Sequence, residues 1–178
     1  EAVRDKISNK TRLIFIANPN NPTGTWVGLE EIEKLLLAVP KSVWVVIDEA
    51  YFEYLDHPQY GSALCLMERF ENLIITRTFS KIYGLASLRL GYGITSSKFA
   101  DLLNRARQPF NVGGLTLAAG VVALSDDEFV FESRQENEKG LRQLEKGLDE
   151  LGLPWIPSGG NFLAVNCGRD GQELFREL

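Results

Sequence analysis

Three short apolar runs, each followed at once by polar or turn-forming residues, constrain the fold of this chain more than any other feature. They cover residues 13–17, 43–47 and 73–78. The middle run is continuous and rich in β-branched residues, as expected of a parallel strand that is covered on both faces. Helical patterns separate the runs. The chain is therefore predicted to be an α/β protein with a mostly parallel sheet flanked by helices.

The remaining elements follow from the same periodicities. Apolar residues at helical spacing predict a helix from Gly28 to Val39, which Pro40 ends. The other predicted elements are a helix around 64–70, a strand over 90–95, helices over 99–106 and 115–124, a long amphipathic helix that ends at Gly152, strands at 155–156 and 162–165, and a helical tail. The character of the sequence changes after the long helix. We expect a large domain over 1–125, a connecting helix over 126–152 and part of a small α+β domain over 153–178.

Composition limits the classes of function. The chain has 178 residues, of which 44% are hydrophobic and 24% charged, so it fits one compact domain or parts of two. A formal charge of −5 and the lack of a basic run argue against a nucleic-acid partner. Cys65 and Cys167 are isolated and have no metal-ligand spacing, which indicates a reducing compartment without a metal. No apolar run approaches the roughly 20 residues of a membrane span, and we expect a cytoplasmic protein.

Polar side chains follow each of the three predicted strands. Two prolines and a glycine force a turn over residues 18–24, and this turn carries Asn21. The carboxyl ends of parallel strands meet at one edge of a sheet, which is where α/β proteins bind ligands. The other polar residues at these ends are Asp48, Tyr51, Thr78, Ser80, Lys81 and Arg89. We expect all of them to border one site.

Lys81 gives this site its predicted chemistry. An amine at the edge of an apolar sheet, near a guanidinium, is pushed toward its neutral form and becomes nucleophilic toward a carbonyl. The hydroxyls of Thr78 and Ser80 are hydrogen-bond donors, and the planar fork of Arg89 matches a phosphate. An aldehyde that carries a phosphate satisfies both groups. The residues therefore predict a site for pyridoxal phosphate, with Lys81 joined to the aldehyde as a Schiff base.

The other strand ends complete the predicted site. Asp48 would pair with the cofactor's ring nitrogen and keep it protonated, so that the ring withdraws electrons from a carbanion. Tyr51 and Asn21 would donate hydrogen bonds to the ring oxygen. Taken singly, the turn over 18–24 also fits an ordinary surface turn, and Lys81 and Arg89 also fit ordinary surface charges beside a turn. His57, the only histidine, is interpreted as a solvated loop residue.

Another class of enzyme also has a strand that ends in Asp-Glu, as this chain does at residues 48 and 49. In nucleotide hydrolases such acids hold a metal and its attacking water. Those enzymes need a glycine-rich loop with Gly-Lys-Ser or Gly-Lys-Thr, which this sequence lacks. The hydrolase interpretation is therefore weak.

Five stretches of the sequence resemble a known family. Three of them resemble motifs of the fold type I aminotransferases related to aspartate aminotransferase. They are Asn-Asn-Pro-Thr-Gly at 20–24, Asp-Glu-Ala-Tyr at 48–51, and Thr-Phe-Ser-Lys at 78–81 with Arg89 beyond. The other two resemble stretches of the histidinol-phosphate aminotransferases within that group. They are Arg-Gln-Pro-Phe-Asn-Val at 107–112 and Pro-Ser-Gly-Gly-Asn-Phe-Leu at 157–163. Gly113 departs from the usual Asn-Val-Asn pattern.

The resemblance implies a reaction and partners. The implied reaction transfers an amino group between histidinol phosphate and 2-oxoglutarate, forming glutamate, in histidine synthesis. Lys81 would hold the cofactor and then move a proton between the substrate α-carbon and the cofactor carbon. The resemblance also implies a homodimer. Four features of the family's site lie outside the matched stretches. They are the loop that binds the cofactor phosphate, the aromatic ring stacked on the cofactor, a tyrosine given to the neighbouring subunit, and the arginine that binds the substrate.

Several expectations and alternatives accompany this resemblance. The chain starts at Glu1, and its only methionine is Met67. We therefore expect a fragment of a longer protein that is inactive alone. There are three alternatives. The first is an aminotransferase or decarboxylase of the same fold with another substrate. The others are a ligand-sensing regulatory domain of aminotransferase shape and a plain α/β domain without a cofactor.

Overall fold

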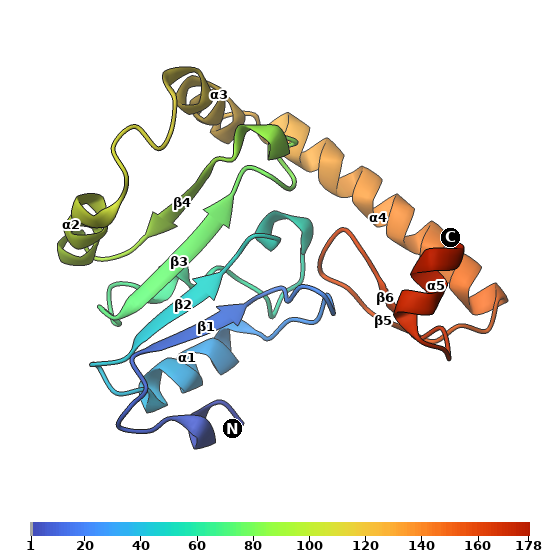
Figure 1. Ribbon diagram of the computed structural model, residues 1–178, viewed down its shortest axis with the longest axis horizontal. Helices are drawn as coiled ribbons and strands as arrows, with labels where there is room; N and C mark the ends of the chain where they lie inside the picture. Colours follow the sequence, from blue (N-terminus) through green and yellow to red (C-terminus); the bar gives the residue numbers. More distant parts are fainter. Residues whose placement is uncertain (1) are drawn as a thin grey trace.

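A four-stranded sheet forms the centre of the computed structural model, which describes residues 2–178. Its strands are β1 (Leu13–Ala17), β2 (Trp44–Asp48), β3 (Leu73–Thr78) and β4 (Gly91–Ile94), in that spatial order (Figure 1). β1, β2 and β3 run parallel, whereas β4 is antiparallel to β3. The three parallel strands therefore end at the same edge of the sheet, as predicted.

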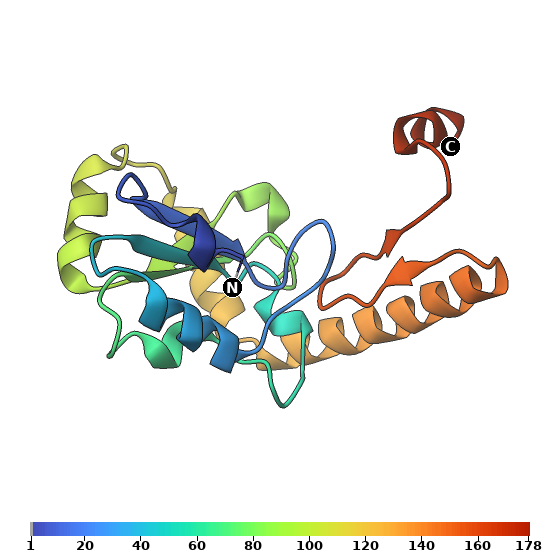
Figure 2. The ribbon, with the colours of Figure 1, turned by 90° about the horizontal axis from the view of Figure 1, so that it is seen from below.

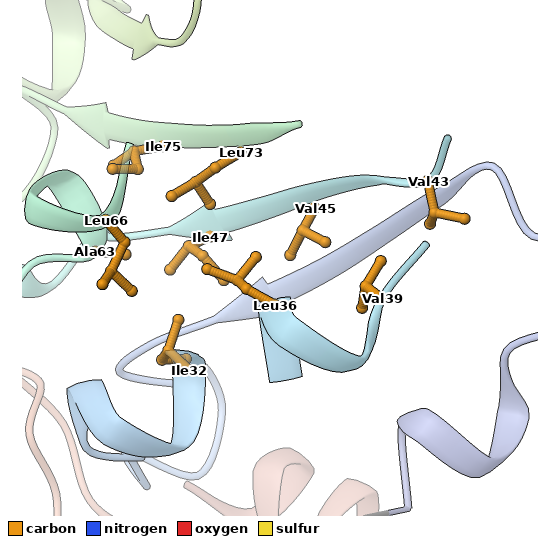
Figure 3. Packing of buried hydrophobic residues seen from close by; sticks show 10 residues of the cluster. All are labelled: Ile32, Leu36, Val39, Val43, Val45, Ile47, Ala63, Leu66, Leu73 and Ile75. Atoms are coloured by element: carbon orange, nitrogen blue, oxygen red, sulfur yellow. The ribbon is translucent and has the colours of Figure 1, made fainter. Parts of the chain in front are cut away.

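The main core lies between one face of this sheet and α1 (Leu29–Ala38). Alternate residues of a strand point to opposite faces, so Val45 and Ile47 of β2 share a face with Leu73 and Ile75 of β3. Figure 3 shows these side chains meeting residues of α1 and the loops around it. The buried cluster comprises Ile32, Leu36, Val39, Val43, Val45, Ile47, Ala63, Leu66, Leu73 and Ile75. Burial of this apolar face fixes which side chains of the strands point the other way.

Two helices follow β4 and lie beside it, α2 (Ser97–Ala106) and α3 (Gly114–Leu124) (Figure 1). Gly120 is the buried residue of α3. A Cβ atom there would lie 2.5 Å from Leu90 Cδ2, so this helix needs a glycine to approach the chain before β4. The short 3₁₀ helices are η1 (Arg4–Lys6), η2 (Phe52–Tyr54), η3 (Ala63–Leu66) and η4 (Ala86–Leu88).

The long helix α4 (Asp127–Glu150) leads away from the main sheet (Figure 2). Its first turn is capped by Asp126, whose carboxylate accepts a hydrogen bond from the Phe129 N–H. Gly152 ends it with φ +67°, and the Leu153 N–H donates to the Leu148 carbonyl as in a Schellman motif. The antiparallel pair β5 (Trp155–Ile156) and β6 (Ala164–Val165) and the helix α5 (Gly171–Glu177) follow.

Most predicted elements are confirmed, and one is wrong. The helix expected around 64–70 is only the single 3₁₀ turn η3. Ala63 and Leu66 are buried while Leu64 is 42% exposed, and this three-residue spacing suits a 3₁₀ turn. The predicted strand over 162–165 is shorter than expected. His57 is exposed, as predicted, and its ring lies against Trp26.

The division into three domain segments stays a prediction. Among the helices within residues 2–178, none is long and apolar enough to cross a membrane.

Candidate functional site

The candidate site lies at the carboxyl edge of the parallel strands. In the register of the sheet, Asp48 at the end of β2 pairs with Ala17 at the end of β1 and with Thr76 in β3. Ala17, Asp48 and Thr76 are therefore level, and β3 continues two residues further, to Thr78. The loops that follow them carry Asn21, Tyr51 and Lys81, and each loop turns at the same edge of the sheet.

Tyr51 is the centre of this group and is only 5% exposed. Asn21 Nδ2 donates a 2.8 Å hydrogen bond to the Tyr51 hydroxyl. Because the Tyr51 oxygen accepts this bond, its own O–H hydrogen remains a donor for a ligand. The Lys81 amine lies 5.2 Å from the centroid of the Tyr51 ring, within the range of a cation–π interaction. The structure thus brings together residues from all three loops.

Asp48 presents its carboxylate on the sheet face opposite to the main core. The Thr76 hydroxyl donates to Asp48 Oδ1 at 3.0 Å, and this bond orients the half-buried carboxylate. Its other oxygen, Oδ2, remains an acceptor. A carboxylate held in this way can accept a hydrogen bond from a protonated ring nitrogen.

A second group gathers after β3. Arg89 Nη1 lies 3.2 Å from Ser80 Oγ, and the Ser80 N–H donates to Thr78 Oγ1 at 3.1 Å. Arg89 has a left-handed backbone with φ 51° and ψ 42°, which costs a non-glycine residue about 1–3 kcal/mol. Its guanidinium also donates to the Ala86 carbonyl. The strained turn therefore directs a cation back to the Ser80 hydroxyl, and the Ser80 N–H in turn joins the Thr78 hydroxyl to this group. A cation beside hydroxyls is a combination that suits a phosphate.

A loop distant in the sequence closes onto the site. The Gly159 N–H donates to the Gly24 carbonyl at 2.8 Å, and the Phe162 ring packs edge-on against Tyr51 at 5.3 Å. Gly24 has φ +73°, and a Cβ atom there would lie 2.1 Å from Ser158 Oγ. Residues 157–162 thus support the central tyrosine from a segment more than 100 positions further along the chain.

Burial controls the ionisation of Glu53, which lies near the site. Desolvation raises the pKa of its carboxyl above the ordinary value, and the charge of Arg77 and a hydrogen bond from Tyr83 only partly oppose this rise. Burial likewise raises the pKa of Tyr83 to about 12. The negative charge of nearby Glu49 also raises the pKa of the Glu53 carboxyl.

This shift predicts a stability change with pH. A carboxyl whose pKa is raised by folding stabilises the folded state while protonated and loses that contribution as pH rises through the folded pKa. Glu53→Gln should therefore raise the free energy of unfolding at pH 7. The gain should disappear below about pH 4, where Glu53 is protonated in both states. Urea denaturation at pH 7 and below pH 4 measures the free energy of unfolding of each variant, with exposed Glu150→Gln as the control. An equal change for Glu53→Gln under both conditions would contradict the prediction.

The donor set fits pyridoxal phosphate. Lys81 supplies an amine beside a phenol and an amide, Asp48 supplies an anchored carboxylate, and Arg89 supplies a cation beside hydroxyls. These are the groups that an aldehyde, a ring nitrogen, a ring oxygen and a phosphate require. The assignment of each residue to a part of the cofactor remains a prediction.

Sequence reasoning missed two residues next to the site. Glu49 and Arg77 form an ion pair at 2.8 Å, with side chains only 2% and 15% exposed. A signal was present, because the parallel register of β2 and β3 places the residue after Asp48 beside the residue after Thr76. The contact between Phe162 and Tyr51 was also missed, and local sequence holds no signal for it.

Comparisons with known proteins place the chain among aminotransferases. Histidinol-phosphate aminotransferase 2 of Pseudomonas fluorescens strain Pf-5 is 52% identical over 99% of this chain, which spans 48% of that relative's length. The crystal structure of histidinol-phosphate aminotransferase from Sinorhizobium meliloti in complex with pyridoxal-5'-phosphate superposes with a TM-score of 0.83 at 32% identity, covering 90% of this chain and 43% of that one. A putative histidinol-phosphate aminotransferase from Erwinia carotovora atroseptica gives 0.89 at 28% identity, covering 95% and 49%.

A family model gives the broadest match. The model described as aminotransferase class I and II matches residues 1–178, the full extent of the chain. The solved structures have the same fold type I architecture of a mostly parallel sheet flanked by helices. The chain therefore belongs to the class I and II aminotransferase family.

Proposed function

We propose that the protein containing this chain transfers an amino group between histidinol phosphate and 2-oxoglutarate with pyridoxal phosphate as cofactor. The observation that carries this proposal is the contact of Lys81 and Asn21 with Tyr51 at the carboxyl edge of the sheet. The choice of substrate rests on relatives named histidinol-phosphate aminotransferase, whose sequences are about half identical to this chain. The chain spans about half the length of these relatives.

Each residue has a proposed part in holding the cofactor. The Lys81 amine would hold its aldehyde carbon, and the Asp48 carboxylate would hold its ring nitrogen. The Tyr51 hydroxyl and Asn21 amide would donate to its ring oxygen. Thr78, Ser80 and Arg89 would bind its phosphate. When bound, pyridoxal phosphate supplies an electron sink that stabilises negative charge at the substrate α-carbon.

The chain's own residues supply orientation and proton transfer. Tyr51 is fixed by the rings of Phe162 and Tyr54 and by Asn21, so its hydroxyl has a defined position. Lys81 would accept the proton of the substrate α-carbon and return one to the cofactor. Its side chain is half-buried, which leaves part of it open toward a substrate. The homodimer and the cytoplasmic location are parts of the same proposal.

A substrate panel tests this proposal. The protein is expressed from the complete gene that encodes this chain, loaded with pyridoxal phosphate and supplied with 2-oxoglutarate. Glutamate formation is then compared for histidinol phosphate, histidinol, aspartate and phenylalanine, and carbon dioxide release is measured with amino-acid phosphates. We expect the largest kcat/KM with histidinol phosphate. A preference for phenylalanine, or carbon dioxide release, would replace the proposed substrate with one of the alternatives above.

A further inference from the structure

A buried ion pair lies directly behind the candidate site, on the opposite face of the two strands that carry it. Arg77 Nε and Nη2 both donate to Glu49 Oε2, at 3.0 and 2.8 Å. Glu49 is 2% exposed, and the Arg77 side chain is 15% exposed. Neither side chain points toward the candidate site, because Glu49 and Arg77 alternate with the residues that do.

The Glu49 carboxylate is fully engaged. Ser62 Oγ lies 3.0 and 2.8 Å from its two oxygens, and the Ala63 N–H donates to Oε1 at 2.8 Å. Arg77 Nη2 also donates to Ser62 Oγ at 2.9 Å. A buried charge with so many directional partners has one preferred position, and a displacement would break several charge-assisted bonds together.

Arg77 is fixed on its other side as well. Its guanidinium lies over the Phe52 ring, with 4.3 Å from Cζ to the ring centroid. Burial alone would lower the pKa of Arg77, but the hydrogen bonds and charge of Glu49 outweigh this and raise it. The guanidinium is therefore a permanent cation between a carboxylate and an aromatic face. Phe52 directly follows Tyr51, so this contact joins Arg77 to the loop that carries the central tyrosine.

The pair is coupled to the site through the backbone. Glu49 directly follows Asp48, and Arg77 directly precedes Thr78. The Glu49 N–H donates to the Thr76 carbonyl at 2.9 Å, and Thr76 in turn orients the Asp48 carboxylate. A shift of β2 against β3 at this edge would therefore change the distance from Asp48 to the turn after Thr78.

Stability alone does not explain such a pair. Two buried charges lose their hydration, and apolar residues of similar volume often stabilise a fold as well or better. What the pair supplies that apolar residues do not is direction, because its N–H···O bonds fix both distance and angle. We propose that Glu49 and Arg77 are positioning residues that hold Asp48 at a fixed place relative to Lys81. This inference rests on the proposed function, because it concerns the same site.

The test compares two double variants of the protein expressed from the complete gene. Glu49→Leu/Arg77→Leu removes both buried charges, so no unpaired charge remains. Glu30→Ala/Lys34→Ala is the control and removes an exposed ion pair of α1. Each protein is loaded with pyridoxal phosphate. The measurements are the urea midpoint, kcat and KM, and the pH at which the visible absorption of the lysine-bound cofactor changes form.

We expect the buried-pair variant to fold, with kcat about ten- to a hundredfold lower and KM changed less than about threefold, because small misplacements of reacting groups have costs of this size. The pH of the absorption change should move by roughly half a unit, since Asp48 is displaced. The control should match the unmodified protein. An unchanged kcat and an unchanged absorption pH in the folded variant would overturn the inference, even if the urea midpoint fell.

Two further comparisons complete the test. If the double variant does not fold, Arg77→Lys, which keeps the charge but loses the two-pronged contact, takes its place with a smaller shift expected in the same direction. The unmodified protein separates this inference from the proposed function. Failure to transaminate histidinol phosphate, with a normal lysine-bound cofactor, overturns the substrate alone. Absence of any lysine-bound cofactor overturns both.

Discussion

Lys81→Ala is expected to abolish covalent capture of pyridoxal phosphate and to lower the rate of amino-group transfer at least about a hundredfold. The lower bound follows from proton transfer, because a positioned general base alone contributes about 10²–10⁴-fold. The Lys81 amine lies 5.2 Å from the centre of the Tyr51 ring, and Asn21 donates a hydrogen bond to the hydroxyl of the same tyrosine. No other side chain named in this site carries an amine. Borohydride reduction followed by peptide mass spectrometry measures the attachment, and glutamate formation measures the rate.

The matched control for this variant is Lys98→Ala. Lys98 is exposed on α2 and belongs to none of the three loops of the site. Its replacement should leave both the mass of the trapped peptide and the rate unchanged. Continued attachment in Lys81→Ala, at the level of the unmodified protein, would contradict the assignment and direct attention to another lysine.

The sheet was predictable because its signals are local. β1 and β3 begin and end at the predicted residues, since apart from Arg77 each is a run of apolar or β-branched side chains. The placement of the candidate residues at one edge of the sheet was predictable for a related reason, whereas their roles stay predictions. Most of them lie at the end of a parallel strand or in the loop that follows it, and the parallel order of β1, β2 and β3 brings those positions to one edge.

What could not be predicted depends on contacts between distant segments. The sequence predicted the apolar helix α3, but in the structure Leu115 is 90% exposed and Gly120 is its buried residue. Its composition predicts that the segment is helical but does not predict which residues the helix contacts. The Phe162 contact with Tyr51 joins positions 111 residues apart. Side-chain partners such as Ser62 for Glu49 likewise become visible only once the loops are placed.

Asp48→Asn is the second substitution with a large expected effect. The amide has nearly the size of the carboxylate, and its oxygen can still accept the Thr76 hydroxyl hydrogen. It lacks the negative charge that keeps the cofactor's ring nitrogen protonated. We therefore expect kcat to fall about 10²–10³-fold, the usual range when one electrostatic contact to developing charge is removed. The urea midpoint should change little, because the half-buried side chain keeps its hydrogen bond.

Thr76→Val separates the charge of Asp48 from its orientation. Valine has the shape of threonine but removes the hydroxyl that donates to Asp48 Oδ1, so the carboxylate keeps its charge and loses its orientation. A kcat loss of about tenfold, clearly smaller than that of Asp48→Asn, is expected. Asp101→Asn on the exposed side of α2 is the charge control and should match the unmodified protein. An Asp48→Asn enzyme that retains its kcat with the cofactor bound would show that the ring nitrogen does not depend on this carboxylate.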